Sequence, residues 1–210
     1  MLRRLELVDM DAAMLVYRTA FDHALPSLAG LHTPKEDQWF FRERVFRTCE
    51  AWGAFDGTAM IGMIAFRDDW IDQLYVLPKA QGRGVGTELL QVAQRCFDHL
   101  QLWTFQRNVR ARRFYEARGF ALIQKTDGAG NEEKEPDALY RWTRSQVARG
   151  YNAAVQSKRY LATAASSQDN PSPWPRAVTV PSMISMGSAR MARPRSRTSS
   201  QCAVGVTASM

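Results

Sequence analysis

The chain has 210 residues, which is enough for one domain with a single core and an extension. Apolar residues make up 45% of it and charged residues 23%, a composition that excludes a wholly disordered or membrane-embedded protein. The net charge of +7 is uneven: residues 1–143 carry 19 Lys and Arg against 20 Asp and Glu, whereas residues 144–210 carry 9 against 1. Because the basic excess lies outside the part with a core and comes without a recognition motif, nucleic-acid binding is not favoured.

Metal binding and membrane insertion are not predicted either. Cys49, Cys96 and Cys202 lie far apart, and they form no ligand-like cluster with the three histidines. The first residues lack the apolar run of a signal peptide, and no 18-residue apolar stretch occurs. We therefore expect a cytoplasmic protein without a metal.

The N-terminal third predicts one strand, two helices and a hairpin. Alternating apolar residues predict a strand over 2–8, and Asp9 or Asp11 can cap a helix that runs to about residue 25. Pro34 is typical of a helix start, and an apolar stripe continues that second helix to about residue 49. The pair Asp56-Gly57 predicts a tight turn between strands over 51–55 and 60–66.

The middle of the chain predicts a strand, a glycine-rich turn and a helix in direct succession. Residues 70–77 are dense in aliphatic and aromatic side chains, which indicates a buried central strand. Helical spacing then extends over about 84–99, and a further strand over 100–105 follows. Asn108 predicts the start of a helix that runs to residue 116, and Gly119 predicts its end.

Strands over 120–124 and 139–142, separated by a polar loop over 127–137, complete the predicted domain. Beyond about residue 145 the periodicity stops, and Ser, Ala, Pro and Arg dominate. Such a segment cannot bury enough apolar surface to offset its ordering entropy. We therefore expect a domain over residues 1–144 and a disordered basic tail over residues 145–210.

The glycine-rich turn predicts a phosphate site. A turn between a strand and a helix leaves the first N–H groups of the helix unpaired, and glycines let a diphosphate approach the backbone. The neighbouring arginine and threonine can add contacts to the phosphates. The alternative for such a turn, taken alone, is a plain strand-to-helix connection without a ligand. The sequence of this turn matches neither the dinucleotide-binding pattern nor a P-loop. The residues concerned are Gln81, Gly82, Arg83, Gly84, Val85, Gly86 and Thr87.

Two motifs together resemble those of the GCN5-related N-acetyltransferase (GNAT) superfamily. The first is the turn above, after a strand that ends in Leu74-Tyr75-Val76. The second has the form Asn-x-x-Ala-x-x-Phe-Tyr-x-x-x-Gly-Phe, and here its members are Asn108, Ala111, Phe114, Tyr115, Gly119 and Phe120. Both occur in the family's order and at its spacing, and the resemblance covers about residues 2–143.

The resemblance implies an α/β fold of the α+β type, with a mixed sheet flanked by helices whose central strand splays away from the next strand. It implies that acetyl-CoA binds as co-substrate, with its phosphates on the turn and its pantetheine arm on the exposed edge of Leu74, Tyr75 and Val76. The N–H of Val76 is then a candidate donor to the thioester oxygen, where negative charge develops. Asn108 is a candidate contact of the pantetheine, a helix cap, or both.

The resemblance also implies candidates for proton transfer. A Lys-like amine with a pKa of about 10.4 is almost wholly charged at pH 7, so forming the neutral, nucleophilic amine costs about 4.6 kcal/mol. Asp72 is the first candidate for the base, with the alternative that it only orders the neighbouring loop; Asp68, Asp69 and Glu36 are weaker candidates. Tyr115 matches the position that stabilises the departing thiolate, with a core tyrosine as the alternative.

Several assignments stay open at this point. Arg112 and Arg113 are as compatible with a solvated face as with a nucleotide phosphate contact. Six aromatic residues fit the core better than an acceptor pocket: Trp39, Phe40, Phe41, Trp52, Trp70 and Trp103. The family builds its acceptor site in residues 25–39, whose mixed charges show no clear preference.

Together these features predict an acetyl-CoA-dependent N-acetyltransferase that acts by direct attack of a primary amine, on a small molecule or a protein. The alternative is a non-catalytic acyl-CoA-binding or sensor module of the same fold. The expected partner is an amine of unknown identity, no membrane association is expected, and a homodimer is compatible with the sequence.

Overall fold

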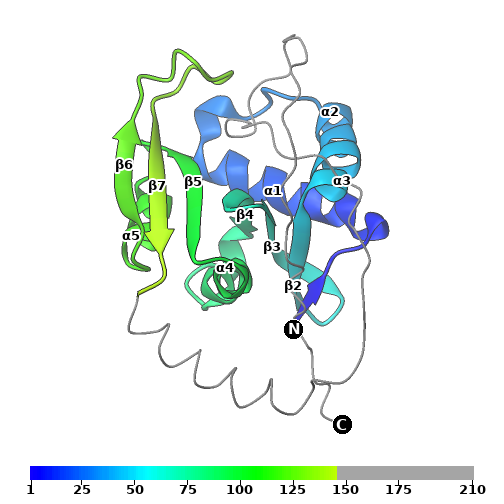
Figure 1. Cartoon of the computed structure of the whole chain (residues 1–210). Helices are drawn as coiled ribbons and strands as arrows, with labels where there is room; N and C mark the ends of the chain where they lie inside the picture. Colours follow the sequence, from blue (N-terminus) through cyan, green and yellow to red (C-terminus); the bar gives the residue numbers. More distant parts are fainter. Residues whose placement is uncertain (146–210) are drawn as a thin grey trace, which may run out of the picture.

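The computed structural model describes residues 1–145, and its centre is a seven-stranded mixed sheet (Figure 1). The strand order is β1-β2-β3-β4-β5-β7-β6, and all neighbours are antiparallel except β4 and β5. The strands are β1 (Leu2–Arg4), β2 (Glu50–Asp56), β3 (Ala59–Arg67), β4 (Trp70–Val76), β5 (His99–Phe105), β6 (Ala121–Lys125) and β7 (Asp137–Thr143). The α/β mixed-sheet prediction is therefore confirmed.

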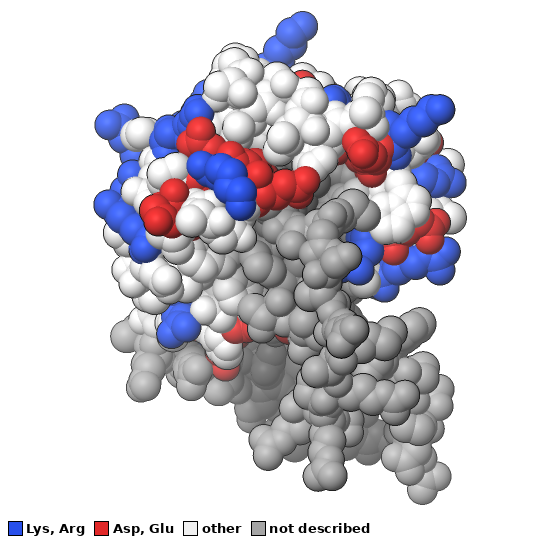
Figure 2. Space-filling view, turned by 90° about the horizontal axis from the view of Figure 1, so that it is seen from above, with Lys and Arg blue, Asp and Glu red and all other residues white. Residues whose placement is uncertain are grey.

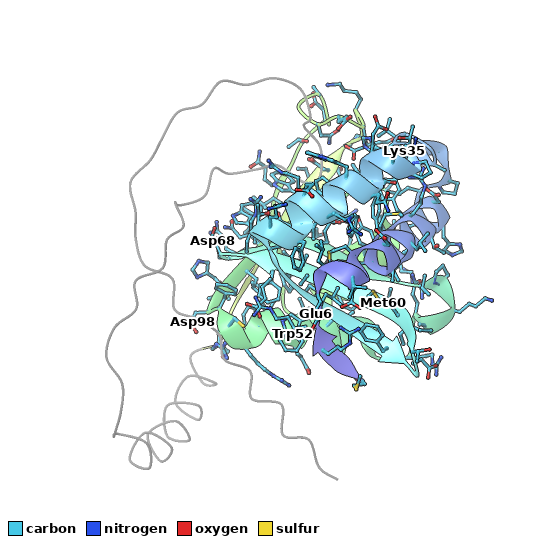
Figure 3. All side chains as sticks on the ribbon, turned by 90° about the vertical axis from the view of Figure 1, so that its right-hand side faces the viewer. Glu6, Lys35, Trp52, Met60, Asp68 and Asp98 are labelled. Atoms are coloured by element: carbon cyan, nitrogen blue, oxygen red, sulfur yellow. The ribbon has the colours of Figure 1, made fainter. Side chains whose placement is uncertain are left out.

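One face of the sheet is covered by α1 (Met10–Ala24) and by a second helical segment (Figure 3). That segment consists of α2 (Pro34–Trp39), a π-helical stretch over Phe40–Val45 and α3 (Phe46–Thr48). Thr33 caps α2 by accepting a hydrogen bond from the N–H of Glu36. The buried side chains of this layer include Met10, Phe41 and Met63.

The other face carries α4 (Val85–Cys96) and α5 (Val109–Glu116). Leu89 and Leu90 of α4 pack with Ile64 and Leu102 of the sheet in the larger of the two core clusters. Since the two faces have separate cores, each helix layer is held on the sheet by its own apolar contacts.

The sheet opens between β4 and β5, which pair only at Trp70 and Gln101. A bulge in β4 accompanies this opening: Ala65 pairs with Gln73 and Phe66 with Ile71, so Asp72 is the extra residue. The splay that the family resemblance implied is therefore present, and it leaves the second half of β4 without a partner strand on one side.

Some predicted boundaries were wrong. The strand predicted over 2–8 ends at Arg4, because Leu7–Asp9 forms a 3-10 turn in which Asp9 accepts from the N–H of Glu6. The helix predicted to reach residue 99 ends at Cys96, and His99 already pairs with Thr143 in the sheet. Apart from Ser145, the predicted tail over residues 145–210 lies outside the described residues.

Candidate active site

A cavity of about 510 Å³ opens where β4 and β5 separate. It extends from the glycine-rich turn to the start of α5, and the second half of β4 forms one of its walls. Residues that line it include Leu74, Val76, Gly82, Trp103, Asn108 and Tyr115. Its size is that of a ligand pocket, and it brings both sequence motifs to one space.

The backbone groups of Leu74 and Val76 face this gap. The N–H of Leu77 donates to the carbonyl of Ile61 in β3, with an N···O distance of 2.9 Å. Because successive residues of a strand point their backbone groups to opposite sides, those of Val76 and Leu74 point away from β3. The Val76 carbonyl accepts from the side-chain amide of Gln81 at 2.8 Å, which ties the turn to the strand.

The glycine-rich turn has the backbone that its sequence predicted. Gly82 and Gly84 have φ of 79° and 86°, in the left-handed region that favours glycine, and Gly84 is the N-cap of α4. A Cβ at either position would meet no atom of the described residues within 4 Å, so the surface beside the turn is open. At Gly86, by contrast, a Cβ would come within 3.1 Å of the Phe114 ring, so this glycine lets α4 and α5 pack closely.

Arg83 is exposed at the rim of this turn, whereas a second arginine reaches it from the end of α5. The guanidinium of Arg118 hydrogen-bonds the hydroxyl oxygen of Thr87. The sequence reasoning missed Arg118, which follows the second motif's tyrosine by three residues. The sequence signal that could have identified it is its position, in the turn that follows the helix of the second motif.

Asn108 and Tyr115 lie at the two ends of α5. The side-chain oxygen of Asn108 accepts from the N–H of Ala111 at 3.1 Å, which confirms the predicted cap. Tyr115 is 7% exposed, and its ring contacts Phe114 and Phe120. No hydrogen bond to residues 1–145 holds its hydroxyl, and burial raises the pKa of this phenol, so the group keeps its proton at neutral pH.

Asp72 borders the cavity, but protein groups hold its carboxylate. One oxygen accepts from Nε of Arg67 at 2.7 Å and from the Cys49 thiol at 3.2 Å, and the other accepts from Arg67 at 3.4 Å. Burial and the negative charge of Asp72 raise the pKa of the Cys49 thiol, which therefore stays protonated. These contacts support the alternative in which Asp72 orders its surroundings, and its role as base stays a prediction.

The weaker candidates for the base are also engaged or distant. Glu36 accepts from the backbone and hydroxyl of Thr33, and Asp69 accepts from Gln101. Asp68 lies in the turn before β4, at the opposite end of the α1 layer from Lys35 of the predicted acceptor segment (Figure 3). None of the three lines the cavity.

Two tyrosines and one arginine lie at the end of the cavity that α1 lines, and of these only Tyr75 was a candidate from the sequence. Tyr17 of α1 and Tyr75 of β4 meet edge to face, with ring centroids 5.0 Å apart, and Tyr75 lines the cavity. Arg107, at the end of β5, donates to the hydroxyl of Ser27 at 2.6 Å and to Glu135 at 2.7 Å. It thereby connects the α1–α2 segment with the loop between β6 and β7, and its own side chain lines the cavity.

The aromatic residues expected in the core are not all buried. Phe41 and Trp52 are buried as expected, but Trp39 is 46% exposed and Trp103 lines the cavity. Arg112 donates to the hydroxyl of Tyr140 at 3.0 Å, so this side chain has a structural contact. Figure 2 shows basic and acidic side chains intermixed on the face seen from above.

The described part of the chain has neither a metal-binding cluster nor a helix able to cross a membrane. Over residues 1–145 no cluster of three or more His, Cys, Asp and Glu side chains is arranged to hold a metal ion. In the same range, every helix is too short or too polar to cross a bilayer.

Comparison with known proteins agrees with the geometry. A sequence model of the acetyltransferase (GNAT) family matches residues 17–120. The peptidyl-lysine N-acetyltransferase YiaC of Escherichia coli is 28% identical over 48% of this chain and 68% of its own length.

Solved structures share the fold at low sequence identity. The apo form of YjaB from Escherichia coli superimposes with a TM-score of 0.58 at 17% identity, over 69% of this chain and 98% of that one. The PaiA N-acetyltransferase of Thermoplasma acidophilum, solved with coenzyme A, gives 0.52 at 18% identity, over 68% and 98%. With both motifs placed around one cavity and the family match spanning them, the chain belongs to the GNAT family of acetyltransferases.

Proposed function

We propose that this protein transfers the acetyl group of acetyl-CoA to a primary amine by direct attack within a ternary complex. The observation that carries the proposal is the cavity between β4 and β5, which joins the glycine-rich turn to the exposed edge of β4 and to Tyr115. A coenzyme with phosphates at one end and a thioester at the other fits this succession of groups.

The residues present suit acetyl-CoA as the substrate that supplies the activated acetyl group. The open surface at Gly82 and Gly84 and the start of α4 suit its diphosphate, together with Arg83, Val85, Gly86 and Thr87. The backbone N–H groups of Leu74 and Val76, which face the gap, suit its pantetheine amides, and Asn108 lines the same channel. Coenzyme A in the complex of the related PaiA enzyme supports this assignment.

Two groups of the chain serve the transfer itself in this proposal. The N–H of Val76 points into the gap and donates to the thioester oxygen, on which negative charge builds as the amine attacks. The Tyr115 hydroxyl, which remains protonated and has no partner in residues 1–145, donates to the departing thiolate.

The contacts of Cys49 support direct transfer over a covalent enzyme intermediate. Its thiol donates to Asp72, burial raises its pKa, and it does not line the cavity. A protonated, enclosed thiol is a poor nucleophile.

Thiol release from acetyl-CoA, measured over a panel of amines, tests the proposal. The panel contains amino acids, polyamines, an aminoglycoside and a lysine-containing peptide, the last because the related YiaC protein is a peptidyl-lysine N-acetyltransferase. Turnover with at least one amine supports the proposal, and Tyr115→Phe should lower the rate constant of transfer about 10-fold or more with little change in acetyl-CoA affinity. Binding of acetyl-CoA without thiol release from any amine would favour the sensor module instead.

A further inference from the structure

The end of the cavity that α1 lines has an arginine beside an aromatic wall. Arg107 lines the cavity and comes just after Phe105, the last residue of β5. The Phe105 ring meets the Phe21 ring with centroids 6.4 Å apart. Tyr17 then joins Phe21 to Tyr75, with centroid distances of 5.5 Å and 5.0 Å. Because Tyr75 belongs to the strand edge where we place the thioester, ring contacts lead from the site of transfer to the strand end that carries Arg107.

The guanidinium of Arg107 uses its two edges differently. Its Nε and Nη2 atoms donate to the two carboxylate oxygens of Glu135, at 3.0 Å and 2.7 Å. Asn131 holds Glu135 in turn, because it accepts from the backbone N–H of Glu135 and donates to its carbonyl. On the other edge, Nη1 and Nη2 both donate to one atom, the hydroxyl oxygen of Ser27, at 2.6 Å and 2.7 Å. Glu135 therefore fixes the orientation of Arg107, whereas a single neutral oxygen occupies the second edge.

This second edge suits a carboxylate better than a hydroxyl group. A carboxylate offers two oxygens and a negative charge to the two donors, and such charge-assisted hydrogen bonds are about twice as strong as neutral ones. Ser27 is exposed in the short 3-10 segment Pro26–Leu28, and within residues 1–145 its hydroxyl is held by Arg107 alone. The carboxylate of a ligand can therefore replace the Ser27 hydroxyl while the pair of Arg107 with Glu135 stays intact.

The charged side chains of the cavity also favour an anionic group on the acceptor. Among residues 1–145, Asp72 is the one carboxylate that lines the cavity, and Arg67 already holds it. Basic side chains of the lining are Arg107, Arg110 and His23. An acceptor with several ammonium groups would find no free carboxylate among these described residues, whereas an acceptor with a carboxylate meets an oriented guanidinium.

Resting on the proposed function, we propose that Arg107 binds the carboxylate of an acceptor that carries both a primary amine and a carboxylate. The carboxylate takes the place of the Ser27 hydroxyl, and the apolar body of the acceptor lies against Phe21, Leu25 and Phe105 of the cavity wall. The amine extends along this wall towards the thioester. The acceptor class is therefore an amino acid, and Arg107 determines specificity without taking part in the bond changes.

The first test measures the preference for a carboxylate on the acceptor. L-leucine, 4-aminobutanoate and 6-aminohexanoate, which differ in the spacing of amine and carboxylate, are each compared with their uncharged carboxamides as the ratio of kcat/KM values. For at least one of the three pairs, this ratio should fall about 10-fold or more in Arg107→Gln. The comparison between enzymes cancels the different amine pKa values of acid and carboxamide, because these affect the natural chain and the variant alike.

Ser27→Ala is the matched variant, because its effect should have the opposite sign. It removes the hydroxyl group that competes for the second edge of Arg107, so the same ratio should rise about 2-fold or more. This variant also decides the matter if Arg107→Gln does not fold. An unchanged or lower ratio in Ser27→Ala would contradict the replacement of the hydroxyl by a carboxylate.

The second test needs no turnover. The carboxylates 4-methylpentanoate and hexanoate have an apolar body but no amine, so they bind without reacting. In calorimetric titrations with coenzyme A present, at least one of them should bind the natural chain, and Arg107→Gln should bind it about 10-fold more weakly. The affinity for acetyl-CoA should be the same in the natural chain and in both variants.

The outcomes separate this proposal from the proposed function. If the natural chain binds a carboxylate through Arg107 but releases no thiol with any amine, acetyl transfer is contradicted and the carboxylate site stands. If thiol is released and Arg107→Gln keeps the natural ratio for all three pairs, the role of Arg107 alone is overturned. Equal losses with acids and carboxamides, together with weaker acetyl-CoA binding, would also overturn it, because Arg107 would then only hold Ser27 and Glu135 in place.

Discussion

Arg118 donates two hydrogen bonds to the hydroxyl oxygen of Thr87, from Nε at 3.1 Å and from Nη2 at 2.5 Å. The guanidinium also stacks over the Phe114 ring, with its central carbon 3.8 Å from the centroid, and donates to the Phe114 carbonyl. Since the hydroxyl oxygen accepts from the arginine, its own hydrogen is free to be donated elsewhere. Thr87 is thereby oriented as a donor at the first turn of α4, where we place the diphosphate.

Replacement of Arg118 by Ala should weaken acetyl-CoA binding about 5-fold or more. The change removes a positive charge near the phosphates and frees the Thr87 hydroxyl to rotate. Isothermal titration with acetyl-CoA measures the effect, and Arg95→Ala, an exposed arginine in the last turn of α4 without a contact to Thr87, is the matched control. Equal dissociation constants for Arg118→Ala and the natural chain would contradict the assignment.

Gly84→Ala should damage the turn more than its small volume suggests. Gly84 has φ of 86°, so a side chain there costs about 1 kcal/mol of strain, and its Cβ would project from the backbone that receives the phosphates. We expect acetyl-CoA affinity to fall about 10-fold, with a modest loss in melting temperature. Gly130→Ala is the control, because that position has no positive φ and no described atom within 4 Å of a Cβ; similar effects at both positions would show that the turn has no special role.

The elements that the sequence predicted best are those whose signals are local. The glycines of the turn and the Asn108 cap each act within a few residues, so their patterns survive in any fold that contains a strand, a turn and a helix. The shortened first strand shows the limit of such reasoning. Apolar and polar residues do alternate over 2–8, but the contact of the Asp9 side chain with the Glu6 backbone turns the chain at Leu7.

The residues that the sequence did not predict depend on approaches between distant segments. Arg107 is an ordinary strand-end residue until the fold brings Ser27 and Glu135 to it from positions 80 and 28 residues away. Glu133 lies in a loop whose composition indicated only polarity, and the burial of its carboxylate oxygen exists only in the folded chain. The same holds for Asp72, whose contacts with Arg67 and Cys49 could not be read from its position in a motif.

The variant Asp72→Asn tests whether the Asp72 carboxylate has a structural role or acts as the catalytic base. The pair with Arg67 is partly buried, so its loss should lower the free energy of unfolding by about 1–3 kcal/mol. If the carboxylate only orders the bulge, kcat at pH 7 should stay within about threefold of the natural value at a temperature where the variant is folded. A fall of 100-fold or more, without a fall in Asp68→Asn, would instead restore Asp72 as the base.

Burial raises the pKa of Glu133, which predicts a pH dependence of stability that needs no substrate. Its folded-state pKa of about 7 lies above the ordinary value of 4.5, so between these pH values the folded chain holds a proton that the unfolded chain has released. Stability from this group is therefore fully present below about pH 4.5 and is lost as the pH rises through about 7. The half-exposed carboxylate is screened by solvent, which reduces the expected loss to about 1–2 kcal/mol.

Glu133→Gln removes this titration and should melt at a higher temperature than the natural chain at pH 8. Its advantage should shrink towards pH 5, since both chains are then neutral at this position. Melting temperatures of the natural chain, Glu133→Gln and Glu132→Gln at pH 5 and pH 8 give the comparison, in which the Glu132 variant should follow the natural chain. If Glu133→Gln also followed it at both pH values, the carboxylate would be solvated in the folded protein, which would contradict its raised pKa.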